Sequence, residues 1–279
     1  MSPVTFELVQ ALSLSQLRRV TAFVNELPDA AWSVQSACGE WEVGDVIAHL
    51  TGAADMWAGL LPAMATGGQA PKAWALPDPS RQGSTADDSK GLRRRLGDAA
   101  LRQQFALHTA RLGEAVRGLT PRDSDKTSPA ARGGRTTVRD TLSVIVGETA
   151  FHQWDMESRV RPEAHLPRET FPVLTGYLAG WRTFGFRRSP PHPPVHYRWE
   201  LSEETPAPER WDIVVAGDSF RHERNPAHDP DVVFRTDPES YILIGMGRLD
   251  LLAALKAGRV EARGPRQAIE AYPRYFASM

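Results

Sequence analysis

Cysteine is almost absent from this chain of 279 residues, which has only Cys38. One thiol excludes an intramolecular disulfide, and it excludes a zinc site built from several cysteines. Any metal that the chain binds must therefore be held by histidine and carboxylate side chains. We expect Cys38 itself to be a buried structural thiol and not a nucleophile, because an isolated cysteine usually packs as a small apolar side chain.

An excess of charge of either sign is also missing. Lysine and arginine number 33, aspartate and glutamate number 34, and the formal net charge is −1. This balance gives no support to a nucleic-acid partner or to an anionic membrane surface. The sequence has no P-loop, no Gly-x-Gly-x-x-Gly turn and no nucleophile elbow. We expect the partners to be small molecules, and the chain to be a monomer or a homodimer.

Long apolar runs are lacking too. No stretch approaches the roughly 20 apolar residues that a membrane-spanning helix needs. The first residues, MSPVTFELVQ, lack the basic start and the apolar stretch of a secretory signal. These absences predict a cytoplasmic protein.

Amphipathic helices are expected in the first half. Apolar residues recur at helical spacing over four segments, about 6–27, 43–61, 92–119 and 137–160. Four such helices predict an all-α four-helix bundle, with up-down-down-up or up-down-up-down topology.

Polar segments separate these helices. Residues 61–90 are rich in Pro, Gly, Ser and Asp, so we expect a lid or an ordered surface loop there. Residues 121–136 are expected to form a second polar loop. This loop and the helix after it carry four arginines, Arg122, Arg132, Arg135 and Arg139. They could attract an anionic substrate or a thiol cofactor, although a solvated loop is the simpler interpretation.

The pattern changes after the proline-rich SPPHPP of residues 189–194. Short segments rich in β-branched and aromatic residues follow and predict strands: HYRWEL, RWDIVVAG and DVVFRTD. Three further segments read as helices: PESYILIGMG, LDLLAALKAG and PRQAIEAYPRYF. We expect a smaller α+β domain with helices on one face of a sheet. The expected organisation is a helix bundle over 1–165, a bridging helix and Pro-rich linker over 166–194, and the α+β domain over 195–279.

Three polar side chains on two of the expected bundle helices could carry chemistry. Glu148 and His152 lie four residues apart in GETAFHQWD, so they face the same way, beside the apolar stripe of their helix. A carboxylate there is costly unless something neutralises it, and a divalent cation would do so. His49, in DVIAHL, lies beside the apolar stripe of the second helix. Two histidines and one carboxylate are a ligand set of catalytic zinc, which leaves a fourth position open.

The same residues have a simpler interpretation. A Glu and a His four apart often form a hydrogen-bonding pair on a helix surface or between helices. A histidine such as His49 is often a satisfied core residue. Even if a metal binds, the ligands do not identify it, because Fe(II), Ni and Mn use the same donors.

Two segments resemble the signatures of the DinB-like metalloenzymes, in particular of the mycothiol-dependent maleylpyruvate isomerases. These segments are WEVGDVIAHLTGAADMW (41–57) and RTTVRDTLSVIVGETAFHQWDM (135–156). The resemblance covers about the first 160 residues and implies that His49, Glu148 and His152 bind the metal, with zinc as the expected ion. The chain departs from the pattern at Glu42, where relatives often have Ser or Thr, which weakens the expected helix N-cap.

Residues 229–276 resemble the sterol-carrier-like domains that accompany the metal domain in these isomerases. In the isomerase an arginine of this second domain reaches the active site, and the resemblance implies that Arg248 is that catalytic residue. Arg259, which also follows a glycine, is a competing candidate. A solvated arginine at a helix end is the plainer interpretation of Arg248.

The resemblance implies a reaction in which a metal activates mycothiol as a thiolate. The thiolate would add to an activated cis double bond, the adduct would rotate, and elimination would give the trans isomer. A mycothiol S-transferase on the same site is the nearest alternative. Alternatives of another class are a non-catalytic carrier of hydrophobic ligands with a structural metal, and a stress-linked DinB-like protein with a vestigial site.

Other polar residues receive plainer predictions. Asp45 could orient His49 or simply favour the start of its helix. Asp155 is expected to pair with an arginine or to cap its helix. The remaining histidines show no ligand spacing and are assigned to the surface: His108, His165, His192, His196, His222 and His228.

Overall fold

The chain divides into two compact units. In the computed structural model, the described residues are 4–68, 84–129, 135–161, 163–190, 192–202, 209–224 and 229–276. Unit 1 comprises Met1–Val173 and unit 2 comprises Leu174–Met279. The division lies within the 166–194 segment, early in the helix Phe171–Gly185.

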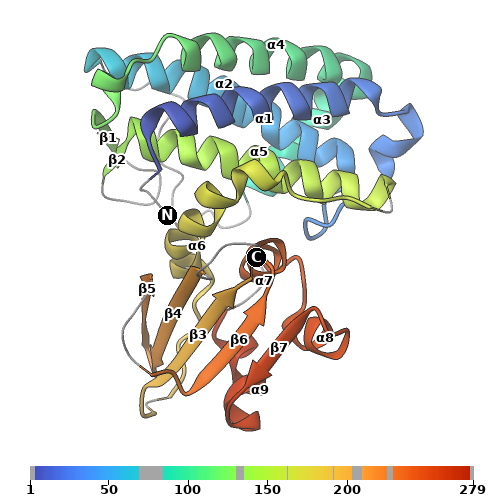
Figure 1. Cartoon of the computed structure of the whole chain (residues 1–279). Coiled ribbons are helices and arrows are strands. Elements are labelled where there is room, and N and C mark those ends of the chain that lie inside the picture. The colour runs from blue at the N-terminus through green and yellow to red at the C-terminus, as the bar shows by residue number, and fades with distance from the viewer. Residues whose placement is uncertain are drawn as a thin grey trace. The chain divides into compact units, whose positions relative to one another are not determined.

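Unit 1 is built on a four-helix bundle. Its helices are α1 (Phe6–Glu26), α2 (Val43–Thr66), α3 (Ser84–Leu96), α4 (Asp98–Arg117) and α5 (Val138–Val160). Both α1 and α2 pack against α4 and α5, so α1 and α2 lie on one diagonal of the bundle and α4 and α5 on the other (Figure 1). Helix α3 packs outside this bundle, against α2 and α4.

Hydrogen bonds between helices fix the direction of α1. Gln10, near the start of α1, donates from Nε2 to the carbonyl oxygens of Val116 (2.8 Å) and Leu119 (3.0 Å) at the end of α4. The two helices are therefore antiparallel. Ser13 donates to the carbonyl oxygen of Leu142 (3.3 Å), near the start of α5. Helices α1 and α5 therefore run in the same direction.

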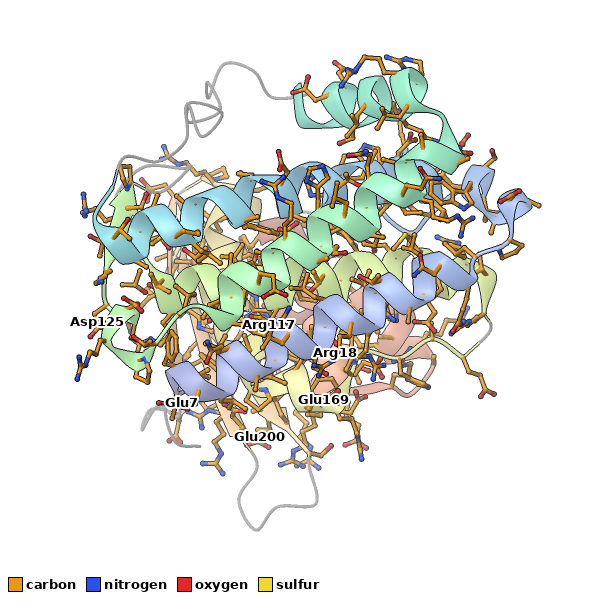
Figure 2. The ribbon with its side chains drawn as sticks, turned by 90° about the horizontal axis from the view of Figure 1, so that it is seen from above. Glu7, Arg18, Arg117, Asp125, Glu169 and Glu200 are labelled. Carbon is orange, nitrogen blue, oxygen red and sulfur yellow. The ribbon has the colours of Figure 1, made fainter. Side chains whose placement is uncertain are left out.

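Helix α2 runs against α5. Thr141, in the first turn of α5, donates from Oγ1 to Sδ of Met64 at the end of α2 (3.9 Å). Together with the direction of α1, this gives up-down-down-up topology, the first of the two that the sequence predicts. Seen from above, α1 and α4 lie side by side, with Arg18 on the first and Arg117 on the second (Figure 2).

The prediction of a single third helix over 92–119 is wrong in one respect, because the structure has two helices there, α3 and α4. Gly97 has φ of +73°, a conformation that interrupts a helix and that glycine adopts without strain. The apolar spacing continues across the break, so periodicity alone does not detect it. Arg93 and Asp98 form an ion pair across it (Nε–Oδ1 2.8 Å).

The two predicted loops also contain regular structure. Helix α2 continues to Thr66 and α3 begins at Ser84, so both enter the 61–90 segment; residues 69–83 lie outside the described residues. The 121–136 segment contains a 3-10 turn, Pro121–Asp123, and an antiparallel pair of short strands, β1 (Thr127–Pro129) and β2 (Arg135–Thr137).

The bundle core is apolar and closed to water. Trp32, Ile47, Phe105 and Met156 belong to one buried cluster that joins α2, α4, α5 and the turn after α1. Each large side chain buried in this way contributes about 1.5–3 kcal/mol. The core therefore holds α2 and α5 in a fixed register.

Unit 2 contains a five-stranded sheet of order β5-β4-β3-β6-β7. Its strands are β3 (Val195–Leu201), β4 (Glu209–Ala216), β5 (Ser219–Arg224), β6 (Val232–Thr236) and β7 (Val260–Arg263). Only β3 and β6 are parallel; the other pairs are antiparallel. The sequence predicts β3, β4 and β6. It does not predict the two edge strands, because β5 is polar and β7 has four residues.

Helices cover one face of this sheet, as the sequence predicts (Figure 1). The unit contains α6 (Phe171–Gly185, which begins in unit 1), α7 (Pro238–Gly245), α8 (Leu251–Lys256) and α9 (Arg266–Tyr275). The ring of Trp199 on β3 lies 5.3 Å from Tyr241 of α7 and 5.7 Å from Tyr272 of α9. The opposite face carries charges, among them the pair Arg198–Asp212.

No helix in the described part of the chain has the length and apolar character needed to cross a membrane.

Candidate functional site

Side-chain caps define where the two site-bearing helices begin. Thr137 accepts from the amide of Asp140 (3.0 Å), and the Asp140 carboxylate accepts from the Thr137 amide (3.4 Å), which forms a capping box at the start of α5. At the start of α2 the Asp45 carboxylate accepts from the Glu42 amide (3.1 Å), whereas the Glu42 side chain accepts from Arg93 (2.7 Å). The start of α2 is therefore held by Asp45, and the departure at Glu42 does not prevent the helix from beginning there.

The three predicted ligands converge between α2 and α5. Oε2 of Glu148 lies 3.3 Å from Nε2 of His49 and 3.4 Å from Nε2 of His152. The side chains of His49, Glu148 and His152 are 18%, 18% and 11% exposed. Two ligand atoms at about 2.0–2.1 Å from a tetrahedral zinc lie roughly 3.3–3.4 Å apart. The two distances from Glu148 to the imidazoles therefore match the spacing of neighbouring ligands on a small tetrahedral cation.

The electrostatics of the cluster favour the ionised forms of both Glu148 and His152. Burial alone would raise the pKa of Glu148, but hydrogen bonds with His152 and His49 hold it well below its usual value. Burial would lower the pKa of His152, yet Asp155, Cys38 and Glu148 raise it well above the usual value. Without a cation, the cluster therefore keeps a proton on His152. A metal ion would displace that proton, because only the neutral imidazole is a ligand.

Asp155 has a contact that the sequence did not predict: its Oδ2 lies 3.0 Å from Nδ1 of His152, and the side chain is fully buried. With Nδ1–H donating to Asp155, Nε2 of His152 faces Glu148; it carries a proton in the cluster without a cation and would offer its lone pair once a metal displaced that proton. The three-residue spacing in His-Gln-Trp-Asp was the signal that could have revealed this partner.

The contacts of Asp45 give it a role at the start of α2. Its Oδ2 accepts from the Glu42 amide (3.1 Å), and its Oδ1 lies 3.4 Å from Nη1 of Arg93. Arg93 also contacts Glu42 and Asp98, so it joins α2, α3 and α4 at one end of the bundle. Of the two roles predicted for Asp45, these contacts support the one at the helix terminus.

Trp41 and Cys38 complete the surroundings of the cluster. The Trp41 ring lies 5.0 Å from the ring of His49 and 6.0 Å from that of His152. Cys38 is half-buried and not fully buried as predicted; it packs against the bundle core. Its Sγ also lies near donor atoms of His152 and Asp155, all within 4.8 Å of one another. Sequence reasoning placed neither residue beside the cluster, because both precede α2 in an irregular segment.

We expect Asp155→Asn to weaken divalent-metal binding about 10- to 100-fold, because an amide no longer fixes the orientation and basicity of His152. Competition with a chromophoric chelator measures this change. Glu157→Gln, on the same helix and bonded to Arg161, is the matched control and should leave the affinity unchanged. Equal metal affinities of Asp155→Asn and wild type would remove Asp155 from the site.

The two arginine candidates of unit 2 have different settings. Arg248 is half-buried after α7 and donates from Nη1 to the carbonyl oxygen of Met246 (2.9 Å). Arg259 is exposed and donates to Oγ of Ser240 (3.0 Å). The catalytic role of Arg248 stays a prediction.

The surface assignment holds for some histidines and fails for others. His165 is exposed, as predicted, and His192 is half-buried. The prediction that His108 lies on the surface is wrong: its side chain is 17% exposed, and its Nδ1 lies 2.9 Å from Oδ1 of Asp55. His228 lies outside the described residues. Among the loop arginines, Arg122 and Arg135 are exposed, Arg139 is half-buried, and Arg132 lies outside the described residues.

His196 and His222 are also withdrawn from solvent, in unit 2. His196 pairs with the buried carboxylate of Asp212. His222 accepts at Nε2 from Nη1 of Arg182 (2.8 Å) and lies 3.4 Å from the hydroxyl of Tyr241. Burial, and then the charge of Arg182, lower the pKa of His222 to about 3. Strand β5 was not predicted, so nothing in the sequence placed His222 inside.

Acid is expected to destabilise unit 2 through His222. In the unfolded chain this imidazole takes up a proton below about pH 6.5, whereas in the folded chain it stays neutral down to about pH 3. The unfolded state binds more protons in this window, so stability falls as the pH falls. Between pH 6.5 and 5 the loss is about 2 kcal/mol.

Hydrogen exchange of amides in β4 and β5 measures this loss. His222→Gln should lose about 2 kcal/mol less than wild type over the same interval. His165→Gln, an exposed control, should behave as wild type. Equal pH dependence of wild type and His222→Gln would show that His222 does not titrate in this way.

The fold and the cluster define a class of protein: a helical bundle that gathers histidine and carboxylate side chains between two of its helices, followed by an α+β unit. Residues 14–157 match the family described as the mycothiol maleylpyruvate isomerase N-terminal domain. The chain belongs to this family.

Solved structures agree with this assignment at the level of the fold. A crystal structure of a mycothiol-dependent maleylpyruvate isomerase, and one of a mutant of it, match with a TM-score of 0.65 and 17% identity, over 94% of this chain and 95% of theirs. At this identity the likeness establishes the fold and not the reaction. A sterol carrier protein-2 like protein from Aedes aegypti gives a partial match, with a TM-score of 0.27, 15% identity, and coverage of 36% of this chain and 91% of its own. Among curated proteins, none matches the chain significantly.

Proposed function

We propose that His49, Glu148 and His152 bind one divalent metal ion, and that the chain is an enzyme that uses the metal with a low-molecular-weight thiol. The observation that carries the proposal is the meeting of both imidazole Nε2 atoms at one carboxylate oxygen, at 3.3 and 3.4 Å. A buried carboxylate between two imidazoles needs positive charge, which a proton on His152 supplies in the cluster without a cation and which a divalent metal would supply when bound. Zinc is the expected ion, since these donors and this spacing suit it.

The residues around the cluster support a catalytic site over a closed structural one. Three protein ligands leave the fourth position of a tetrahedral ion for a thiol or water. A divalent metal held there would act as a Lewis acid and lower the pKa of a bound thiol. Asp155 keeps His152 oriented, and the ring of Trp41 shields both imidazoles from bulk water. The chain thus positions the metal ligands, fixes the tautomer of His152 and partly excludes solvent from the two imidazoles.

We propose mycothiol as the thiol and cis-trans isomerisation of a maleylpyruvate-like substrate as the reaction, because the chain belongs to the family that carries this name. The thiolate would add to one carbon of an activated cis double bond and leave a single bond that rotates. Loss of the thiol would restore the double bond in the trans form. Arg248 would hold a carboxylate of the substrate by paired hydrogen bonds.

A mycothiol S-transferase would use the same cluster, and its product would keep the thiol. A carrier of apolar ligands fits less well, because the aromatic core of unit 2 contains the buried guanidinium of Arg182, which an apolar tunnel would exclude.

Product analysis separates these functions. Zinc-loaded protein is incubated with mycothiol and maleylpyruvate, and the products are followed by NMR. A trans isomer without bound thiol supports the isomerase, and a stable thiol adduct supports the transferase. His152→Ala loaded under the same conditions is the control. Turnover of that variant at the wild-type rate, or no thiol-dependent product from wild type with a range of unsaturated and electrophilic acids, would contradict the proposed function.

A further inference from the structure

A second group of possible metal ligands lies on the other side of His152. Donor atoms of Cys38, His152 and Asp155 lie within 4.8 Å of one another. This group, which we call the Cys38 group, offers a thiol, an imidazole and a carboxylate. The cluster of His49, Glu148 and His152 offers two imidazoles and a carboxylate instead. His152 belongs to both sets, so the two sets are neighbours.

The two sets use opposite edges of one imidazole ring. Nε2 of His152 lies 3.4 Å from Oε2 of Glu148, and Nδ1 of the same ring lies 3.0 Å from Oδ2 of Asp155. A neutral imidazole has a free lone pair on only one of its two nitrogens. His152 therefore binds an ion of the cluster through Nε2 or an ion of the Cys38 group through Nδ1, but not both at once.

Backbone hydrogen bonds hold the thiol beside α5. The amide of Ala37 donates to the carbonyl oxygen of Asp155 (2.9 Å), and the amide of Cys38 donates to Oγ of Ser36 (3.1 Å). The amide of Ser36 in turn donates to the carbonyl oxygen of Trp41 (2.9 Å), which closes the turn that carries Cys38. The thiol is thus fixed to the helix that supplies the other two donors.

An ion can reach the Cys38 group from the side of the thiol. Asp155 is fully buried, but Cys38 is half-buried and the side chain of His152 is 11% exposed. A bound ion replaces the protons of the thiol and of Nδ1, so it needs only the space between the donor atoms. Since Nδ1 and Oδ2 are 3.0 Å apart, they must separate by less than about 1 Å to coordinate one ion.

The thiol makes the Cys38 group the softer of the two sets. Thiolate ligands select thiophilic ions, whereas imidazole and carboxylate ligands also suit harder ones. Charge is balanced in the Cys38 group as well, because a divalent ion between a thiolate and the Asp155 carboxylate gives a neutral unit. Such a unit is less costly to bury than an isolated charge. With Nδ1 on the ion, Nε2–H of His152 remains a donor to Glu148.

We propose that Cys38, His152 and Asp155 bind a thiophilic metal ion that competes with the ion of the cluster. Binding releases the proton of the thiol and the proton of Nδ1, and it withdraws His152 from the cluster. His49 and Glu148 then remain as only two ligands for the other ion. A thiophilic ion therefore inhibits any chemistry that needs the metal of the cluster. The Cys38 group shares His152 with the proposed function but does not rest on it.

Titration of the metal-free full chain with cadmium, followed by ultraviolet absorption, tests the proposal. Cys38 is the only cysteine, so a thiolate-to-cadmium charge-transfer band can come only from it. In wild type the band should saturate at one cadmium per chain. Cys38→Ser should abolish the band, and Asp155→Asn should weaken the cadmium affinity that the band reports at least about tenfold. No band in wild type, or unchanged affinity in Asp155→Asn, would overturn the proposal.

Variants of the cluster separate this proposal from the proposed function. His49→Ala and Glu148→Gln should lose zinc but keep the cadmium band at wild-type affinity. Loss of the band in both variants, each shown by circular dichroism to be folded, would assign Cys38 to the ion of the cluster and contradict a separate site. Zinc binding by a wild type that gives no cadmium band would leave the proposed function standing alone, and a cadmium band without zinc binding would do the reverse.

Competition tests whether the two ions exclude each other. Cadmium is added to protein loaded with one zinc, and a chromophoric indicator measures the zinc released. One zinc should leave for each cadmium thiolate that forms. Cys38→Ser, the matched control, should bind zinc as wild type does and release it without a charge-transfer band. Full development of the band in wild type while the zinc stays bound would show that His152 is not shared and would overturn the competition.

Discussion

Replacing His152 with alanine is expected to lower zinc affinity at least about a hundredfold and to leave the purified protein with almost no metal. Structural zinc sites with four ligands bind with roughly 10–16 kcal/mol, so each ligand contributes about 3 kcal/mol or more. That loss corresponds to a factor of about a hundred or more in affinity. His49→Ala and Glu148→Gln should behave similarly, because the three side chains meet at one point.

Elemental analysis and chelator competition measure the effect, with His108→Ala as the matched control. His108 also lies on a bundle helix next to a carboxylate, Asp55, but outside the cluster. Full metal content is expected in this control. Metal retained equally by His49→Ala, His152→Ala and wild type would place the ion elsewhere or show that binding is nonspecific.

Loading the protein with zinc is expected to make thiol binding release about one proton per site at pH 7. A free thiol has a pKa of about 8.5, and coordination to zinc removes its proton outright. Protein stripped of metal should bind mycothiol without this release and should lose thiol-dependent activity at least about a thousandfold, the scale of a lost metal nucleophile.

Calorimetry in two buffers of different ionisation enthalpy counts the protons, and zinc added back to stripped protein should restore both the release and the activity. Asp155→Asn, once saturated with zinc, should still release the proton, because it weakens metal binding without removing a ligand. Proton release that is unchanged after complete removal of the metal would separate thiol activation from the cluster.

The convergence of His49, Glu148 and His152 was predictable because these residues lie on long helices. The spacing of Glu148 and His152 and the apolar stripes of α2 and α5 indicated which faces meet. Asp155 was not predicted as a partner of His152, because its burial follows from packing and not from periodicity. Trp41 and Cys38 were not placed because they lie in an irregular segment, whose course depends on tertiary contacts.

Unit 2 was less predictable. Its class was clear from the change of pattern after residue 194, but β5 and β7 were missed because edge strands need fewer apolar residues. The cluster of Arg182, His222 and Tyr241 joins a helix, an edge strand and a second helix that are distant in sequence. No local pattern marks such a cluster, and a histidine on a polar strand reads as a surface residue.

The central claim is that His49, Glu148 and His152 hold one cation together. X-ray absorption at the zinc edge of the loaded protein tests it most directly. We predict two imidazole nitrogens at about 2.0–2.1 Å, one carboxylate oxygen and one exchangeable light ligand that mycothiol replaces with sulfur at about 2.3 Å. A spectrum without imidazole scattering, or one that is identical in His49→Ala, would contradict the account.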